Sequence, residues 1–476
     1  MNLPDGLVAV VKRECPTCVL VAPVLRELQA AGLPLTVYSQ DDPDFPEHLA
    51  RVVDDRSLEA SFHLNVEIVP TLIRREGGSE SSRVIGWNKD EWRALTRLPS
   101  LGESLPENRP GCGSRSIEPG MPNRLKVRYG NTGLAARGVE LAEDADDIEA
   151  CYDRGWTDGL PVVPPTPERV LDMLEGTRRA PADIVGLIPP NRVECSVEKV
   201  AINAVMAGCR PEYLPVVLAA VEGALIPEFN WHGIIATTNA CGPVVMVNGP
   251  IARAIRMNAK GNVFGQGHRA NATIGRALQL IGRNVGGGRP GEIDRAVFGN
   301  PGKYSFCFAE DEDPHWGSYA SSLGYGPKAS TVTLFAGEGI SPIIDHTSRT
   351  PEELVRSYTE SLLAVYNRRQ VNEVGAFLAV GHEHAQVFHQ GGWSRERLYQ
   401  ELMERLKIPV RDIVPGRSGL GGLSDEEKSD PDRLIPKFRT GRLVIIRAGG
   451  SAGKYSAILT GLGSVSMQPV TVEIRP

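Results

Sequence analysis

The stretch that decides the fold at the start of the chain is Leu7-Val8-Ala9-Val10-Val11-Lys12-Arg13-Glu14-Cys15-Pro16-Thr17-Cys18. Its apolar run, Leu7–Val11, predicts a buried strand, and apolar residues at helical spacing over Cys18–Ala30 predict a helix. Cys15 then lies at a helix N-terminus, where unpaired N–H groups and the helix dipole stabilise a thiolate. Cys18 follows one turn later and can resolve a mixed disulfide. The sequence therefore predicts a redox-active disulfide, Cys15–Cys18.

A strand is expected at Leu35–Tyr38 and a closing helix at Asn88–Leu98. Between them, Pro70 opens another strand in Ile68-Val69-Pro70-Thr71-Leu72. With the two cysteines, this pattern resembles a thioredoxin-like domain over residues 1–100. The resemblance implies that Cys15 attacks, Cys18 resolves and Pro70 contacts the substrate peptide.

Two positions depart from the thioredoxin-like pattern. Ala9 stands where the family has a buried acid, and Glu14 stands where it has tryptophan. We therefore expect a different proton relay, through Glu14 or water, and a different choice of partner. The alternative reading of Cys-x-x-Cys is a zinc site, but the chain has no second pair of this kind to complete one.

Composition sets the class of the protein. A chain of 476 residues predicts two or three domains. It is 41% hydrophobic and 23% charged, with a net charge of −6, which gives no reason to expect nucleic-acid or anionic-membrane binding. No apolar run approaches the roughly 20 residues of a membrane span, and no secretory signal is recognised. The use of eight cysteines fits a reducing compartment, so we expect a cytoplasmic protein.

Residues 101–141, rich in Pro, Gly, Ser and Asn at their start, are predicted to be a flexible linker. Strands alternate with helices over residues 142–476, which predicts a larger α/β domain with a parallel or mixed sheet. Its expected elements include strands at Gly233–Thr237 and Tyr304–Ala309 and a long helix from Thr350 to about Arg368.

The large domain carries a second resemblance. Residues Gly381–Ser394 and Arg447–Ile458 look like the C-terminal part of redox proteins named for a UGSC motif. In that family a selenocysteine or cysteine is followed by Gly-Ser-Cys. Cys112-Gly113-Ser114 could be the relic of this motif, with Arg115 where the second thiol belongs.

Two cysteines of the large domain are candidates for a reactive thiol. Cys241 lies in a turn of small residues with Asn239, where backbone N–H groups could stabilise an anion; the alternative is a buried structural cysteine. Cys307 lies in a predicted strand that leads to Glu310 and an acidic run ending near His315. Glu310 could act as an acid or base or bind a cation, or the run could be a solvated loop.

His382, His384 and His389 follow a predicted strand and could bind zinc or iron; the alternative is a histidine-rich loop with one hydrogen-bonded member. Gly265-Gln266-Gly267-His268-Arg269-Ala270 lacks the preceding strand of a dinucleotide site, but His268 and Arg269 could bind an anion. Residues 449–454 fall one residue short of a P-loop, so nucleotide triphosphate binding is not expected.

These patterns predict a thiol-dependent oxidoreductase. The CxxC domain would recycle an active cysteine of the large domain, with Cys241 preferred over Cys112 and Cys307. That cysteine would act on a small molecule by reduction or reductive cleavage, and a cellular thiol would supply electrons. The predicted site joins residues 239–243, 265–269 and 310–315. The alternatives are a metal-dependent hydrolase or lyase using the histidines with Glu310, and a non-enzymatic redox sensor. Homo-oligomerisation is left open.

Overall fold

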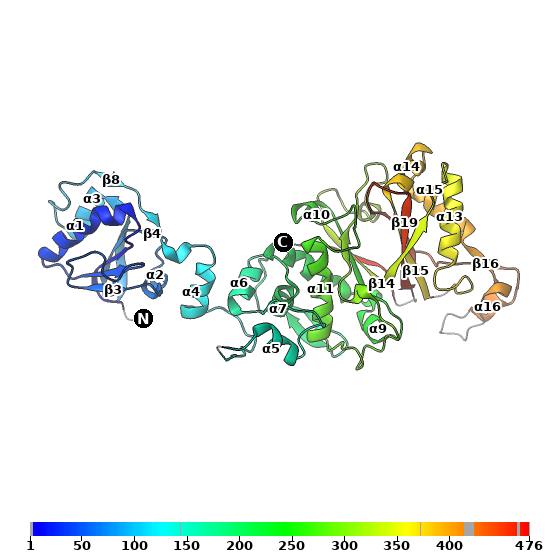
Figure 1. Cartoon of the computed structure of the whole chain (residues 1–476), viewed down its shortest axis with the longest axis horizontal. Coiled ribbons are helices and arrows are strands. Elements are labelled where there is room, and N and C mark those ends of the chain that lie inside the picture. Colours follow the sequence, from blue (N-terminus) through cyan, green and yellow to red (C-terminus); the bar gives the residue numbers. More distant parts are fainter. Residues whose placement is uncertain (1–2, 143, 372, 414–422, 464–466, 476) are drawn as a thin grey trace. The chain divides into compact units, whose positions relative to one another are not determined.

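The computed structural model describes residues 3–142, 144–371, 373–413, 423–463 and 467–475. The chain divides into two compact units, Met1–Gly133 and Leu134–Pro476. Each unit combines helices with a sheet of parallel and antiparallel strands, so the predicted α/β class is confirmed (Figure 1). Hereafter they are the first unit and the second unit.

The first unit is built on a five-stranded sheet in the order β3-β2-β1-β5-β6. Strands β1, β2 and β3 are parallel, and β5 and β6 form an antiparallel hairpin beside β1. Its elements are β1 (Gly6–Val11), α1 (Pro16–Ala30), β2 (Leu35–Ser39), β3 (Val52–Asp54), α2 (Glu59–His63), β5 (Thr71–Glu76), β6 (Ser79–Ile85) and α3 (Lys89–Thr96). Side chains of β1, α1 and α3 share one apolar core.

Residues after α3, up to Gly133, belong to the first unit. Strand β8 (Asn108–Arg109) pairs with β7 (Trp87–Asn88), and β9 (Cys112–Gly113) pairs with β4 (Ile68–Val69). The 3-10 helix η1 (Arg115–Ile117) and α4 (Met121–Tyr129) follow. The expectation of a flexible linker over residues 101–141 is therefore wrong for residues 101–133. Backbone groups of this stretch pair with β4 and β7, which glycine- and proline-rich composition alone did not indicate.

The second unit contains a seven-stranded sheet in the order β13-β12-β14-β19-β15-β18, with β20 also paired to β14. Only the pairs β12/β13 and β15/β18 are parallel. Its strands are β12 (Gly242–Asn248), β13 (Cys307–Ala309), β14 (Thr331–Ile344), β15 (Glu373–Val380), β18 (Leu443–Arg447), β19 (Tyr455–Gly463) and β20 (Val470–Glu473). Two small antiparallel pairs join β10 (Ile184–Ile188) to β11 (Val193–Ser196) and β16 (Lys407–Pro409) to β17 (Leu434–Pro436).

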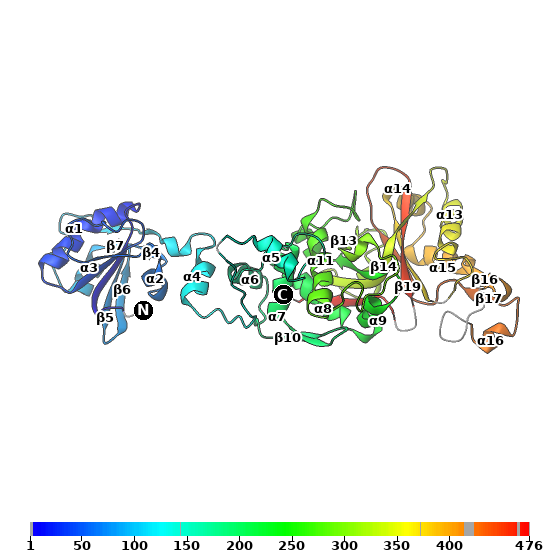
Figure 2. The same cartoon turned by 60° about the horizontal axis from the view of Figure 1, so that its bottom comes forward.

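Two groups of helices pack on this sheet. The first group, α7, α8 and α11, covers the part with β12 and β13, and the second, α13 to α15, covers the part with β15 and β18 (Figures 1 and 2). The helices of the second unit are α5 (Asp147–Asp153), α6 (Pro167–Leu174), α7 (Val197–Ala207), α8 (Leu214–Ala224), α9 (Trp231–Ala236), α10 (Pro250–Ala254), α11 (Arg269–Asn284), α12 (Tyr319–Ser322), α13 (Pro351–Leu363), α14 (His382–Gln390), α15 (Arg395–Arg405) and α16 (Asp425–Lys428).

The opposite face of the sheet carries an aromatic cluster. Phe335 of β14 stacks on Phe377 of β15 with ring centroids 4.4 Å apart. Side chains alternate along a strand, so Leu334 and Leu378 point to the helix-covered face instead. Phe264, from a glycine-rich loop, packs against this aromatic cluster.

Three predicted elements differ in the structure. Residues 233–237, expected as a strand, lie mostly in helix α9, because the Asn230 side chain accepts a hydrogen bond from the N–H of Gly233 and caps a helix. The expected strand Tyr304–Ala309 is paired only over Cys307–Ala309. The helix capped by Thr350 ends at Leu363 rather than near Arg368.

Candidate functional site

The two cysteines of the first unit lie where the sequence predicts them. Cys15 is the residue before α1, Pro16 is its first residue, and Cys18 lies in its first turn. Proline fits that first position because its missing N–H would be unpaired there anyway. Both cysteine side chains are buried against the core of the first unit.

The local environment separates the acidities of the two thiols. A hydrogen bond from Cys18 is the main cause that lowers the pKa of Cys15 to about 5; burial opposes it, and contacts with Cys112 and the first-turn N–H groups add to it. Burial raises the pKa of Cys18 far above its ordinary value, and the neighbouring Cys15 raises it further. At neutral pH this pair therefore holds one thiolate, on Cys15, and one thiol, on Cys18.

The turn before β5 lies against the Cys15 sulfur. The Val69–Pro70 peptide bond is cis, and the Cys15 Sγ atom lies 3.4 Å from the Val69 carbonyl oxygen. Pro70 is held in turn by its carbonyl, which accepts a hydrogen bond of 2.7 Å from the N–H of Gly86. The structure thus brings the predicted residues Cys15 and Pro70 to one place.

A third cysteine, which the sequence ranked behind Cys241, completes this site. Strand β9 pairs Cys112 with Val69 in antiparallel register. The Cys112 Sγ atom lies 2.7 Å from the Cys15 Sγ atom. Cys15 and Cys18 have no exposed surface, whereas Cys112 is partly exposed. The site therefore contains three thiols, of which only Cys112 faces solvent.

The reactive thiol predicted at Cys241 is contradicted by its burial. Cys241 is fully buried within the apolar core, and burial raises the pKa of its thiol to about 12. The cavity that it lines has a volume of about 30 Å³, room for roughly one water molecule. Asn239 folds its side chain onto its own turn, accepting from the N–H of Cys241 and donating to the Tyr366 hydroxyl.

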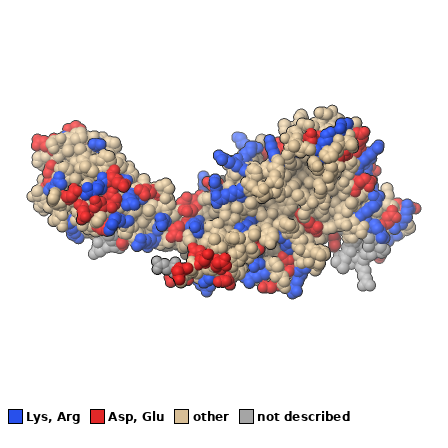
Figure 3. Space-filling model, in the orientation of Figure 1, with Lys and Arg blue, Asp and Glu red and all other residues tan. Residues whose placement is uncertain are grey.

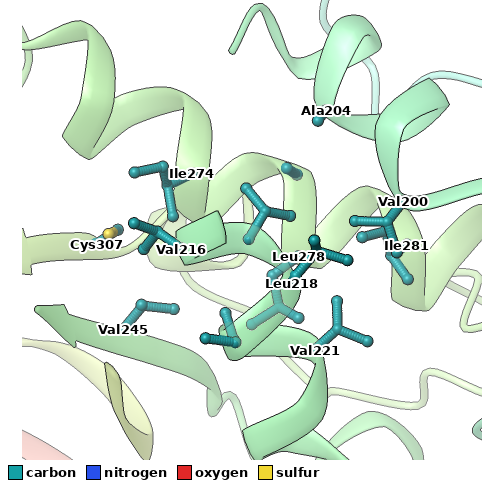
Figure 4. Packing of buried hydrophobic residues seen from close by; sticks show 14 of the residues in the cluster. Val200, Ala204, Val216, Leu218, Val221, Val245, Ile274, Leu278, Ile281 and Cys307 are labelled. Carbon is teal, nitrogen blue, oxygen red and sulfur yellow. The ribbon is translucent and has the colours of Figure 1, made fainter. Parts of the chain in front are cut away.

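Cys307 is also a core residue. Figure 4 shows its sulfur among aliphatic side chains, with Val216 of α8 and Ile274 of α11 nearby. Burial is the main cause that raises the pKa of its thiol well above the ordinary value. Free cysteine in such a place packs as a small apolar residue. The prediction of a reactive Cys307 is therefore wrong.

The predicted convergence of residues 239–243 with residues 310–315 also fails. Cys241 precedes β12, whereas Glu310 is next to the far end of that strand, since Val247 pairs with Ala309. The seven residues of β12 separate the two by about 20 Å at roughly 3.3 Å per residue. The two segments therefore belong to opposite ends of the sheet.

Glu310 is a buried ion-pair partner rather than a group open to substrate. Its carboxylate accepts hydrogen bonds from the Asn248 side chain and the N–H of Tyr319, and pairs with Arg395 at 3.2 Å. Burial is the main cause that raises the pKa of Glu310, and Arg395 opposes it. This carboxylate ties three segments of the second unit together.

The acidic run beside Glu310 meets two of the predicted histidines through an arginine. Arg447, at the end of β18, pairs with Asp311 at 3.2 Å and with Asp313, and its guanidinium lies 2.9 Å from the His382 Nδ1 atom. His389 lies 3.6 Å from Asp313. The Arg447 guanidinium thus already pairs with the two aspartates that a metal ion at this place would need as ligands.

The three histidines do not converge on one point because they belong to a helix. Residues 382–390 form α14 rather than a loop, so His384 points away from His382 and His389. His382 and His389 are seven positions apart and share a helix face, but they lie about 10 Å apart along the helix axis. His384 is buried, with its Nδ1 atom 2.8 Å from the Ser456 hydroxyl and its Nε2 atom 3.1 Å from the Asp345 carbonyl oxygen. Within the described residues no group of three His, Cys, Asp or Glu side chains could hold a metal ion. The predicted zinc or iron site is therefore wrong.

The proposed anion-binding pair lies at the start of α11. His268 precedes the helix, and its side chain and that of Arg269 are exposed. The Arg269 side chain donates to the Gly208 carbonyl oxygen at 2.8 Å, after the end of α7. Arg269 thus ties two helices together, and its guanidinium is already engaged by backbone oxygen.

A cavity of about 340 Å³ lies at the carboxyl ends of β15 and β18. Two glycine-rich loops line it, residues 262–265 and 448–453, together with side chains at the ends of β14, β15 and β19. The loops approach closely: a Cβ atom on Gly450 would lie 3.0 Å from the Gly261 Cα atom. The sequence analysis singled out residues 265–270 and 449–454, which overlap these loops, as incomplete nucleotide motifs, but nothing in their spacing indicated that the loops meet.

Comparison with known proteins leaves the family open. A scan against protein-family models found no match for the chain, and a search of curated proteins found no significant relative.

Among the described helices none alone is long and apolar enough to cross a membrane. Two helical segments, Pro211–Ala224 and Pro227–Ala236, satisfy that test only when taken together, and they are bent by 76° relative to each other. On the face shown in Figure 3, charged side chains of both signs are interspersed on each unit.

Proposed function

We propose that the first unit is a thioredoxin-like module for thiol–disulfide exchange. The observation that carries this proposal is the pair of opposed acidities, a Cys15 thiolate with a pKa of about 5 beside a Cys18 thiol that stays protonated. The parallel strands β1 and β2, the helix that begins after Cys15, and the turn at Pro70 support the resemblance. Pro70 is buried beside the reactive sulfur, so the substrate contact that the resemblance implies for it would require the strand that carries Cys112 to move aside.

The exchange needs only the two thiols and a disulfide substrate. The Cys15 thiolate attacks one sulfur of a disulfide that is brought into contact with it, that bond breaks, and the departing thiolate takes a proton from water. Cys18 then loses its proton and attacks the Cys15 sulfur, which releases the second substrate thiol and leaves the Cys15–Cys18 disulfide. A cellular dithiol reduces this disulfide and restores the pair.

The test is reduction of a model disulfide by the full chain with a dithiol as the electron source. Cys15→Ser should abolish turnover, and Cys18→Ser should stop after one disulfide per chain, held by Cys15. Cys151→Ser, which alters a buried cysteine of the second unit, is the matched control and should retain turnover. Titration of the thiols without any turnover would favour the redox-sensor alternative instead.

We infer that the second unit binds a small molecule in its 340 Å³ cavity. The observation that favours this role is the position of the cavity, at the carboxyl ends of the parallel strands β15 and β18, where ligands bind in open α/β sheets. Ala379, Ala448 and Ala457 give it apolar walls, which suits a ligand with an apolar body. None of its lining residues is a cysteine, so reduction of this ligand at a thiol of the cavity wall is not part of the proposal.

Thermal stabilisation of the full chain by a panel of small metabolites tests this binding role. Ala452→Phe should fill the cavity from its exposed loop and abolish the stabilisation by any ligand found. Ala180→Phe, at an exposed position outside the cavity lining, should leave it unchanged. Equal loss in both variants, or ligand binding that survives Ala452→Phe, would contradict the assignment.

A further inference from the structure

The segment that carries Cys112 is fixed in an extended conformation across the Cys15 site. On one side of Cys112, β8 pairs Arg109 with Trp87, and the Thr17 hydroxyl donates to the Pro110 carbonyl oxygen at 2.7 Å. On the other side, the N–H of Ser114 donates to the Glu67 carbonyl oxygen at 2.8 Å. The segment therefore lies in the manner of an added strand, a common way in which extended peptides bind.

Two glycines, Gly111 and Gly86, allow the backbone of this segment to lie close to its neighbours. A Cβ atom at Gly111 would lie 2.5 Å from a methyl carbon of Ile68 and 2.6 Å from the Val69 carbonyl oxygen. Gly86, on the other side, has a φ of +72° and would place a Cβ atom 2.9 Å from the N–H nitrogen of Gly111. Side chains at either position would push the segment, and Cys112 with it, away from Cys15.

Burial then determines which thiol meets an external reagent. Cys15 and Cys18 are fully buried, and the strand with Cys112 covers them. Cys112 is partly exposed and lies in contact with the Cys15 sulfur. A small disulfide in solvent can therefore reach Cys112 without any movement of the chain, but not Cys15.

We propose that Cys112 is the resident exchange partner of Cys15 and the thiol at which low-molecular-weight disulfides enter the site. This inference rests on the proposed exchange function of the first unit and names its substrate class and its third reacting residue. The CxxC pair would thus act first on the chain's own cysteine.

The steps balance with a small disulfide as oxidant. Burial and the neighbouring Cys15 raise the pKa of the Cys112 thiol, so Cys112 loses its proton to water as it attacks the small disulfide. A mixed disulfide forms on Cys112, and one small thiol leaves with a proton. The Cys15 thiolate attacks the Cys112 sulfur, the bond to the second small thiol breaks, and that thiol leaves with a proton from water. Cys18 loses its proton and attacks the Cys15 sulfur, so that Cys15–Cys18 forms and Cys112 departs as a thiolate that is reprotonated. Two thiols of the pair are oxidised and one small disulfide is reduced to two thiols.

Trapping in the full-length Cys18→Ser variant tests the second step. The reduced variant is treated with glutathione disulfide, quenched by alkylation and mapped by mass spectrometry. The expected product is an internal Cys15–Cys112 disulfide with glutathione released, and Cys18→Ser/Cys112→Ser should instead show no internal disulfide. A lasting glutathione adduct on Cys15 beside an alkylated Cys112 would overturn the proposal.

Two further readouts make the outcome decisive. Glutathione should accumulate on Cys112 in Cys15→Ser, and its absence there would overturn entry at Cys112. In the Cys18→Ser background, Gly111→Ala should lower the yield of the internal disulfide about tenfold by displacing the strand, since proximity is what makes the transfer fast. Gly113→Ala is the matched control because its Cβ atom would meet only the Ile117 side chain, at 3.7 Å. An unchanged yield in Gly111→Ala would count against the proposal.

These readouts separate this inference from the proposed function. If the wild-type chain turns over a model disulfide but Cys15 never pairs with Cys112, only the resident-partner proposal fails. If Cys15 pairs with Cys112 in Cys18→Ser but the wild-type chain never forms Cys15–Cys18, the exchange function fails while the contact stands.

Discussion

The acidity of one sulfur atom underlies the chemistry proposed for the first unit. Cys15 receives a hydrogen bond from Cys18, another contact from Cys112, and N–H groups of the first turn of α1. These contacts act on a sulfur that burial alone would keep protonated. The low pKa therefore depends on neighbouring thiols at least as much as on the helix N-terminus emphasised by the sequence.

We predict that the thiolate absorbance of the reduced chain contains a titration near pH 5 that disappears in Cys15→Ser. Cys18→Ala should move this midpoint toward the ordinary cysteine value of about 8.5, since it removes the largest stabilising contact. Ultraviolet absorbance against pH measures both, with Cys151→Ser as the control. A midpoint for Cys15 near that of free cysteine would refute the assigned roles.

The same shift links the stability of the reduced first unit to pH. The pKa of Cys15 is lower in the folded unit, at about 5, than in an unfolded chain, at about 8.5. The Cys15 thiolate therefore adds to the free energy of unfolding of the first unit. This contribution is complete above about pH 8.5, shrinks as the pH falls, and is lost below about pH 5. The difference in unfolding free energy between the wild type and Cys15→Ser should therefore narrow on acidification.

Sequence could predict part of the thiol site and not the rest. Cys15, Cys18 and Pro70 were found because local patterns place two of them at a strand–helix junction and the third before a strand. Cys112 sits in a glycine- and proline-rich stretch without periodicity, and its pairing with Val69 is a contact between residues far apart in sequence. Cys241 shares the small-residue context of a reactive turn, and only packing reveals that it is buried.

At the scale of elements, a helix took the place of an expected loop. The histidines of α14 follow a buried strand, and their number suggested a metal site, but their helical spacing divides them between separate neighbours. His384 contacts the hydroxyl of Ser456 in β19. The same hydroxyl lies 2.6 Å from the Tyr358 hydroxyl of α13 and accepts a hydrogen bond from the N–H of Gly381. One hydroxyl thus joins three elements.

Ser456→Ala should lower the free energy of unfolding of the second unit by about 2–3 kcal/mol, because it leaves three buried partners, Tyr358, His384 and the N–H of Gly381, without this hydrogen bond. Chemical denaturation followed by tryptophan fluorescence measures the change. Ser451→Ala, in an exposed loop nearby, should have an effect within about 0.5 kcal/mol. Equal stability of the two variants would show that the network contributes little.

The strands and helices themselves followed from periodicity more reliably than their ends. Apolar runs located β1 and β2, apolar residues at helical spacing located α1, and Thr350 located the start of α13. Residues 233–237 were misassigned because apolar content alone does not separate a short strand from a short helix. There the deciding signal was a single asparagine cap.

On the scale of the whole molecule, the boundary lies at Gly133 and Leu134 rather than near residue 100. The difference has a physical cause, since the indole N–H of Trp87 donates to the Pro106 carbonyl oxygen at 2.7 Å and Lys89 pairs with Glu107 at 3.0 Å. Residues beyond 100 thus supply hydrogen bonds to the core of the first unit.

We therefore expect residues 1–133 and residues 134–476 to fold as separate fragments. A fragment of residues 1–100 should be less stable than residues 1–133 by about 2–4 kcal/mol, because several backbone and side-chain hydrogen bonds are lost. Circular dichroism during chemical denaturation measures each fragment. Equal stability of the two shorter fragments, or failure of residues 134–476 to fold alone, would contradict this boundary.

Strand β14 links the thermal unfolding of the two cores of the second unit. Its first half contributes Val332 and Leu334 to the core under α7, α8 and α11, and its second half contributes Ile343 to the core under α13 to α15. One continuous strand thus contributes side chains to both cores, so unfolding of β14 in one core would also disrupt the other core. Heating should accordingly give one cooperative calorimetric transition for residues 134–476, in spite of two helical layers that would each suffice for a small domain.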